Sequence, residues 1–93
     1  MKRLLLPSQA FVRSARRFAR KHRQLESELQ LRLELLSSDA FHPKLKTHKL
    51  KGKLAGSWAC SAGYDLRILF QFVKHQGQEA ILLEGMGTHD EAY

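Results

Sequence analysis

The stretch that decides the fold is residues 66–73, which read Leu66-Arg67-Ile68-Leu69-Phe70-Gln71-Phe72-Val73. From Leu66 onward every second position is leucine, isoleucine or phenylalanine, and Arg67 opens the alternate set. A period of two is typical of a strand that buries one face. Residues 80–86 are a second largely apolar run, separated from the first by a polar segment that contains Gly77. We therefore expect an antiparallel hairpin with its loop over Lys74–Gln78.

Upstream of this hairpin, the chain predicts one more short strand and a basic loop. Trp58–Ser61 is strand-like, and Gly63-Tyr64-Asp65 is typical of a turn that joins it to residues 66–73. Lys44–Gly56 is rich in lysine and interrupted by glycine, which indicates a loop or a weak edge strand. The three strands predict an antiparallel meander, followed by a polar tail over Gly87–Tyr93.

The start of the chain predicts a strand and then a helix. Lys2–Leu6 has the pattern of a strand that Pro7 ends, and Ser8 is well placed to cap a helix. One face of that helix is apolar at helical spacing. Its residues are Phe11, Val12, Ala15, Phe18 and Ala19. The opposite face carries Arg13, Arg16, Arg17 and Arg20.

A break over His22–Gln24 separates this helix from a second one, which has a leucine stripe. The stripe consists of Leu25, Leu29, Leu33 and Leu36, and Leu31 and Leu35 widen it. Two helices this close in sequence are expected to form an antiparallel hairpin. The predicted architecture is α+β, with an N-terminal strand, an antiparallel helical hairpin and then a three-stranded antiparallel meander, in a single domain over residues 1–93.

Charge is unevenly distributed along the 93 residues, whose formal net charge is +7. Residues 1–53 carry fourteen Lys or Arg against four Asp or Glu, whereas residues 54–93 carry two against five. A basic half of this kind attracts a polyanion, with nucleic acid first, an anionic membrane surface second and an acidic protein third. The single cysteine, Cys60, fits a reducing cytoplasm. No apolar run approaches the roughly 18 residues of a membrane span, so we expect a cytoplasmic protein without a membrane partner.

Four short motifs in the second half of the chain resemble those of one toxin superfamily. They are His48-Lys49-Leu50-Lys51-Gly52, Trp58-Ala59-Cys60-Ser61, Tyr64-Asp65-Leu66-Arg67-Ile68-Leu69-Phe70 and Gly87-Thr88-His89-Asp90-Glu91-Ala92-Tyr93. Their order and spacing resemble the RelE/ParE toxin superfamily and are most similar to its YafQ-like branch, whose members often end in Gly-Thr-His-x-x-x-aromatic. The basic helical hairpin matches the same layout, so the resemblance covers nearly the whole chain.

The resemblance implies a compact, RelE-like and microbial-RNase-like fold and the toxic half of a type II toxin–antitoxin pair. It implies an endoribonuclease that cleaves messenger RNA in the ribosomal A site and needs neither a metal nor another cofactor. The expected partners are a cognate antitoxin, encoded beside the toxin, and the mRNA and ribosome on which the toxin acts.

Metal-free RNA cleavage needs a base for the 2′-hydroxyl proton, an acid for the leaving 5′-oxygen and a cation for the phosphoryl charge. Histidine suits the acid or base role, and arginine suits the cationic one. By resemblance, His89 is the general acid and Arg67 binds the phosphate, while Asp65 or His48 assists as base. Without the motifs, both histidines are ordinary exposed residues and Asp65 is a turn residue. Arg67 would then form a salt bridge, with Glu84 as the candidate partner.

Other residues are predicted to bind RNA or to pack. The proposed phosphate-binding lysines are Lys44, Lys46, Lys49, Lys51 and Lys53. By resemblance, Tyr93 is an aromatic residue at the end of the tail that stacks on a base or positions the phosphate. Trp58 is interpreted as a core residue, and Cys60 as a buried structural thiol. The histidines are not set at metal-ligand spacing, so no metal site is expected.

One position departs from the family pattern. Ser61 stands where the YafQ-like branch carries a histidine, and a serine supplies neither a useful acid nor a useful base. Either His48 and Asp65 suffice, or cleavage is slow, or catalysis has been lost. Two other functions stay open, which are a ParE-like toxin that binds DNA gyrase without nuclease activity and a basic RNA-binding domain. The proposed set of acid, base and arginine favours the nuclease.

Overall fold

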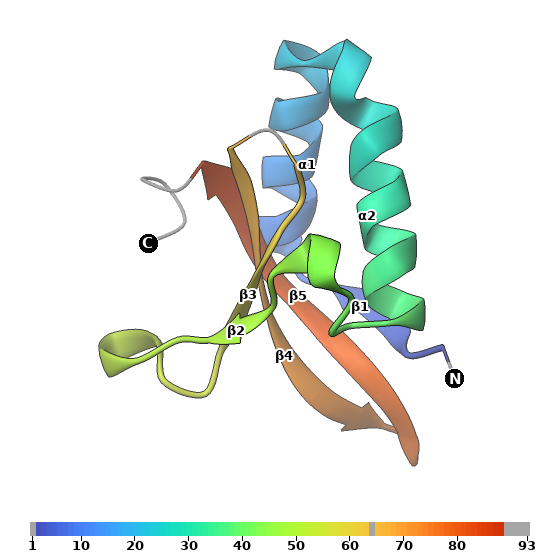
Figure 1. Ribbon diagram of the computed structural model, residues 1–93, viewed down its shortest axis with the longest axis vertical. Helices are drawn as coiled ribbons and strands as arrows, with labels where there is room; N and C mark the ends of the chain where they lie inside the picture. The colour runs from blue at the N-terminus through green and yellow to red at the C-terminus, as the bar shows by residue number, and fades with distance from the viewer. Residues whose placement is uncertain (1, 64, 89–93) are drawn as a thin grey trace.

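The computed structural model describes residues 2–63 and 65–88, and these form two long helices and a five-stranded sheet (Figure 1). The helices are α1 (Gln9–Lys21) and α2 (Glu26–Ser38), and the one-turn helix η1 (Arg23–Leu25) joins them. The strands are β1 (Leu4–Pro7), β2 (His48–Lys49), β3 (Trp58–Ser61), β4 (Leu66–His75) and β5 (Gln78–Thr88). Two more one-turn helices, η2 (Pro43–Leu45) and η3 (Gly52–Leu54), lie in the basic segment. This is the α+β architecture that the sequence predicts.

Ser8 begins α1 as the sequence predicts. Its Oγ accepts a hydrogen bond from the Phe11 N–H at 3.1 Å and donates one to the Glu84 carbonyl oxygen at 3.0 Å. The hydroxyl therefore caps the helix and also fixes its first turn to β5. Helix α1 ends where the break was predicted, and α2 then runs antiparallel beside it (Figure 1).

The arginine face of α1 is exposed, as its spacing predicts, because the opposite face of the helix meets the core. Arg13, Arg16, Arg17 and Arg20 all belong to the exposed set. Over the described ranges, no helix combines the length and the apolar character that a membrane crossing requires.

The strands are ordered β1-β5-β4-β3-β2 across the sheet. Successive strands from β2 to β5 pair antiparallel, which confirms the meander and adds β2 as its edge strand. Strand β1 pairs in parallel with β5, from Leu4 opposite Ala80 to Pro7 opposite Leu83. Pro7 is the last residue of β1 rather than the residue after it, and an edge strand tolerates its missing N–H. No local pattern in the sequence predicts this pairing of the first strand with the last.

The hairpin between β4 and β5 is longer than the sequence predicts. The expected loop over Lys74–Gln78 is wrong, because only Gln76 and Gly77 form the turn, with positive φ angles of 51° and 81°. A two-residue turn with both residues left-handed matches the twist of the strands that it joins. The hairpin tip is exposed on both faces, so its strand residues are polar and show no alternation.

The expected polar tail is also shorter than predicted, because Gly87 and Thr88 are part of β5. Strand β5 also contains a β-bulge, since Phe70 faces Leu83 whereas the preceding residue, Leu69, faces Gly85. Glu84 is therefore an additional residue on β5. Residues on either side of such a bulge can face the same side of the sheet although they are an odd number of positions apart.

The core lies between the helical hairpin and one face of the sheet. Alternate residues of β4 are buried, with exposed fractions of 2% for Leu66 and 0% for Ile68 and Phe70. From the helices, Phe11 and Leu36 pack into the same cluster. This confirms the prediction that residues 66–73 form a strand with one buried face. The intervening residues lie on the other face of the sheet.

Candidate active site

Arg67 lies on the face of the sheet opposite the core. Ser61, Arg67 and Gly87 stand side by side across β3, β4 and β5 in the antiparallel register. Paired residues of antiparallel strands point to the same face, so Ser61 and Arg67 share a surface on which Gly87 adds no side chain. Arg67 is half-buried, and its Nη1 donates to the Leu66 carbonyl oxygen at 3.3 Å. This arrangement holds a permanent positive charge on the open face of the sheet.

A salt bridge between Arg67 and Glu84, the structural alternative that the sequence offered, is wrong. The bulge places Glu84 beside other partners. Its Oε1 accepts a hydrogen bond from the Ser57 hydroxyl at 2.7 Å, and its Oε2 accepts one from Gln71 Nε2 at 3.1 Å. Glu84 therefore links β5 to β4 and to the residue just before β3 rather than neutralising the arginine.

His48 reaches the same face of the sheet from its edge. His48 pairs with Ala59, which in turn pairs with Leu69. It therefore lies two strands away from Arg67 across the sheet and in line with Leu69, two residues further along β4. The imidazole is exposed, and its Nδ1 is 2.9 Å from the Lys46 carbonyl oxygen, to which a protonated Nδ1 donates. The structure thus places two of the predicted site residues on one surface, at a distance that a substrate would have to bridge.

Asp65 occupies the turn before β4, as predicted, and it is exposed. The turn is closed by a hydrogen bond from the Leu66 N–H to the Gly63 carbonyl oxygen at 2.9 Å, and Gly63 has a positive φ of 81°. The Ser61 hydroxyl accepts a hydrogen bond from the Gly63 N–H at 3.3 Å. Ser61, which departs from the family pattern, therefore stabilises the turn that carries Asp65.

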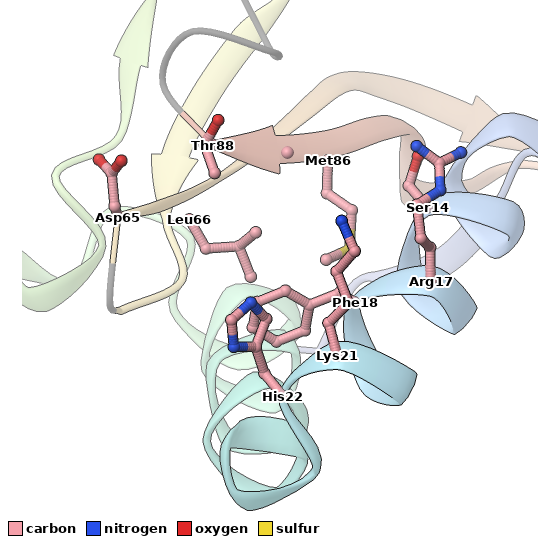
Figure 2. Close-up of a pocket in the computed structure, with 10 residues that line it drawn as sticks. Ser14, Arg17, Phe18, Lys21, His22, Asp65, Leu66, Met86 and Thr88 are labelled. Carbon is pink, nitrogen blue, oxygen red and sulfur yellow. The ribbon is translucent and has the colours of Figure 1, made fainter.

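A cavity of about 260 Å³ lies between the end of α1 and the adjoining ends of β4 and β5 (Figure 2). On the α1 side it is lined by Arg17, Lys21 and His22, and on the sheet side by Asp65 and Thr88. The cavity lies on the core side of the sheet, so Arg67 faces away from it. The structure therefore places Asp65 at the strand end between the Arg67 surface and the cavity.

Sequence reasoning assigned the cavity's helical residues to other roles. The sequence predicts Arg17 only as part of an exposed helix face, and His22 only as part of the break between the helices. A detectable signal was the helical stripe of Ser14, Arg17, Phe18 and Lys21, all of which line the cavity. The ring of His22 also packs on that of Phe18, with centroids 4.9 Å apart. His89 and Tyr93 lie outside the described residues, which end at Thr88, itself part of the cavity wall.

The predicted RNA-binding lysines all lie in one exposed segment at the β2 edge of the sheet. They are Lys44 in η2, Lys46 after it, Lys49 in β2, Lys51 before η3 and Lys53 within η3. The ammonium of Lys49 is 5.4 Å from the centre of the Trp58 ring, so this lysine also makes a cation–π contact. Their role in binding stays a prediction, and their common exposure is what that prediction requires.

Cys60 belongs to the core cluster, and Trp58 packs against it. Trp58 is half-buried and packs against the core cluster rather than lying fully inside it. Cys60 has no exposed area, and burial raises the pKa of its thiol to about 12 although the charges of Arg32 and Arg67 oppose that shift. A thiol that stays protonated at neutral pH is not a nucleophile. Within residues 2–63 and 65–88, no group of His, Cys, Asp and Glu is clustered to hold a metal ion.

Arg32 connects the parts of the site and was not identified from the sequence. Its Nε donates to Glu28 Oε1 at 3.0 Å, and its Nη1 donates to the Lys44 carbonyl oxygen at 2.9 Å. Glu28 and Arg32 also pack against Gly63, where a Cβ atom would lie 3.2 Å from Glu28 Oε1. This ion pair of α2 therefore supports both the lysine segment and the turn that carries Asp65. The only sequence signal was an i,i+4 Glu–Arg pair, which usually marks a solvated helix face.

Both the sequence and the fold of this chain are similar to those of known proteins. Residues 3–93 match the protein family described as the bacterial toxin of type II toxin-antitoxin systems, YafQ. This match covers nearly the whole chain. The chain belongs to the YafQ family of bacterial type II toxins. Comparison with curated protein sequences finds no match.

Solved structures show the same fold at low sequence identity. YafQ from E. coli strain BL21(DE3) is 17% identical, with a TM-score of 0.78 over 99% of both chains. The E. coli DinJ-YafQ toxin-antitoxin complex matches with 18% identity and a TM-score of 0.76, over 100% of this chain and 99% of the other. The YoeB/ParE toxin from Agrobacterium tumefaciens is 14% identical, with a TM-score of 0.75 over 92% of this chain and 98% of the other.

We predict that Arg32→Ala loosens the lysine segment more than the fold as a whole. The change removes one charged hydrogen bond within α2 and one to the Lys44 carbonyl oxygen, both partly exposed, at a combined cost of about 1–2 kcal/mol of unfolding free energy. Urea denaturation measures that cost. Limited digestion with trypsin, which cleaves after lysine, should be faster between residues 44 and 53. Arg13→Ala, an exposed change on α1, is the control, and equal digestion of the two variants would contradict the assignment.

Proposed function

We propose that the chain is an endoribonuclease toxin that cleaves mRNA on the ribosome without a metal ion and acts in the cytoplasm as a single domain over residues 1–93. The observation that carries the proposal is the row of Ser61, Arg67 and Gly87 on the open face of the sheet. It presents an arginine that is always charged beside a glycine without a side chain, which suits a phosphate group of RNA. The family match supports the toxin class, and the chemistry is inferred from the residues.

In the proposed reaction, the 2′-hydroxyl of one nucleotide attacks the adjacent phosphate. Arg67 stabilises the charge that develops on the phosphoryl oxygens. His89 protonates the leaving 5′-oxygen, and Asp65 or His48 takes the proton from the 2′-hydroxyl. Ser61 contributes no proton transfer, because a serine hydroxyl is neither a useful acid nor a useful base near neutral pH. We therefore expect slower cleavage than in relatives that have a histidine at this position.

Substrate binding depends on the basic segment at the sheet edge. The lysines beside β2 and η3 face solvent next to His48, so they would hold the phosphates of the mRNA or of the ribosome. Tyr93 would stack on a base. Because E. coli YafQ is crystallised with its antitoxin DinJ, we infer that this chain too has a cognate antitoxin, whose acidic or amphipathic segment covers the lysines and the surface beside Arg67.

The roles of Arg67 and His89 can be tested by substitution. Arg67→Ala and His89→Ala should each lower the rate of mRNA cleavage by about 10²–10⁴ and relieve growth arrest, because each removes a group that acts in the transition state. The thermal midpoint should hardly change, since Arg67 lies outside the core. Primer extension on a translated mRNA measures the cleavage, and Lys74→Ala, an exposed change at the hairpin tip, is the control.

The same experiment separates the nuclease from the gyrase-binding alternative. A ParE-like toxin needs no acid or base, so both variants would stay fully toxic and no new mRNA ends would form with the wild-type protein. That result would overturn the nuclease proposal in favour of a gyrase-binding toxin.

The lysine segment predicts a salt dependence that can be measured without cleavage. A short single-stranded RNA that carries 2′-O-methyl groups lacks the attacking hydroxyl and stays intact. Replacing Lys51 and Lys53 by alanine should reduce the slope of log affinity against log salt by roughly 0.7 for each lysine that contacts a phosphate. Lys74→Ala should leave the slope unchanged. Identical slopes for all three proteins would exclude the segment from the RNA contact.

A further inference from the structure

Three aromatic rings form an uncovered hollow between the end of α2 and the far half of β4. Phe41 and Phe72 are stacked with centroids 5.7 Å apart, and Trp58 meets both edge-on at 5.6 Å and 5.1 Å. Phe41 is 57% exposed, whereas Trp58 and Phe72 are half-buried. A cluster of aromatic rings that reaches the surface is an apolar patch of the kind that can mark a binding site.

The shape of this aromatic hollow suits one large apolar side chain. Its volume is about 160 Å³, and its walls are the three rings together with Arg3, Val73, Glu79 and Ala80. Val73 and Ala80 are cross-strand partners whose side chains point to the face opposite Phe72, so the backbone of the β4–β5 ladder forms a rigid floor. A pocket with a rigid floor and aromatic walls favours an inserted anchor residue.

The charges around the hollow argue against RNA as its occupant. Lys49 lies over the Trp58 ring at 5.4 Å, and the Arg3 guanidinium lies 5.1 Å from the centre of the Phe72 ring. A stacked nucleobase needs an open ring face, and these two cations already use those rings. The Glu79 carboxylate, 3.6 Å from Arg3 Nε, also lines the hollow and forms an ion pair with that guanidinium.

The hollow is remote from the proposed catalytic surface. Phe72 is five residues from Arg67 along β4, which corresponds to roughly 16 Å at about 3.3 Å per residue. Phe72 also faces the core side of the sheet with Phe70, whereas Arg67 faces the other side. A partner can therefore occupy the hollow without touching the groups proposed for catalysis.

We propose that the aromatic hollow is the anchor site for the antitoxin, which inserts one large apolar side chain flanked by acidic residues. The proposal rests on the proposed toxin–antitoxin function. The apolar residue fits the rings, and the acidic neighbours complement Lys49 and the adjoining lysine segment in a chain of net charge +7. The antitoxin then inhibits the toxin in two separate ways, by anchoring at the hollow and by covering the catalytic surface.

The test compares Phe41→Ala with Leu31→Ala, because both side chains are large, apolar and more than half exposed, at 57% and 60%. The probe is the antitoxin encoded beside the toxin gene. Loss of an anchor contact typically weakens binding by about 30-fold or more. We expect that loss for Phe41→Ala in a calorimetric titration, with Leu31→Ala close to the wild type. Phe41→Ala also loses two aromatic contacts, so its thermal midpoint should fall by a few degrees, and circular dichroism at the titration temperature checks that both variants are folded.

Toxicity without the antitoxin distinguishes this inference from the function on which it rests. Both variants should arrest growth as the wild type does, and co-expressed antitoxin should rescue cells that carry Leu31→Ala but not those that carry Phe41→Ala. Unchanged antitoxin affinity for Phe41→Ala in a toxic protein would overturn the anchor site alone. Weaker binding of Phe41→Ala to 2′-O-methyl RNA, with unchanged antitoxin affinity, would assign the hollow to RNA instead. If the wild-type protein is not toxic, the proposed function itself fails.

Discussion

The pairing of β4 with β5, including the extra residue at Glu84, is the constraint on which the rest of the structure depends. A shift of one residue moves a strand's side chains to the opposite face. With the bulge, Leu83 and Met86 both pack into the core, although they are three positions apart. Without it, Met86 would turn toward solvent and Gly87 toward the helices. The bulge thus places Gly87 beside Arg67 on the open face, and Glu84 binds Ser57 and Gln71 across the neighbouring strands.

Local patterns predicted most of the fold, and pairings between distant segments escaped prediction. The period of two in β4, the Ser8 cap and the leucine stripe of α2 each act within a few residues. The structure confirms the first two and most of the stripe, although Leu31 is 60% exposed. The parallel contact of β1 with β5 joins the two ends of the chain, so no neighbouring residues encode it. The tip of the β4–β5 hairpin was mistaken for a loop because strand residues that are exposed on both faces need no alternation.

The candidate site could be predicted only in part, for the same reason. Arg67 was placed correctly opposite the apolar face because its position follows from the strand period, whereas its catalytic role came from the family resemblance. The cavity beside Asp65 depends on where the end of α1 lies relative to the ends of β4 and β5, and one sequence does not reveal that placement. The sequence does not predict the role of Arg32, because this side chain supports the lysine segment through a hydrogen bond to the Lys44 carbonyl oxygen. Every residue has a backbone carbonyl, so no sequence pattern indicates this partner. His89 and Tyr93 rest on the resemblance alone.

The most direct test of the central claim is the chemistry of the RNA ends that this protein produces. Attack by the 2′-hydroxyl, with Arg67 on the phosphate and no metal-bound water, leaves a 5′-hydroxyl on the downstream fragment and a cyclic phosphate on the upstream one. Ribosomes translating a defined mRNA would be incubated with the wild-type protein, and the new 5′ ends would be ligated with and without prior phosphorylation. The account predicts new ends that can be ligated only after phosphorylation. New ends that already carry a 5′-phosphate, or arrest of translation with intact mRNA, would contradict it.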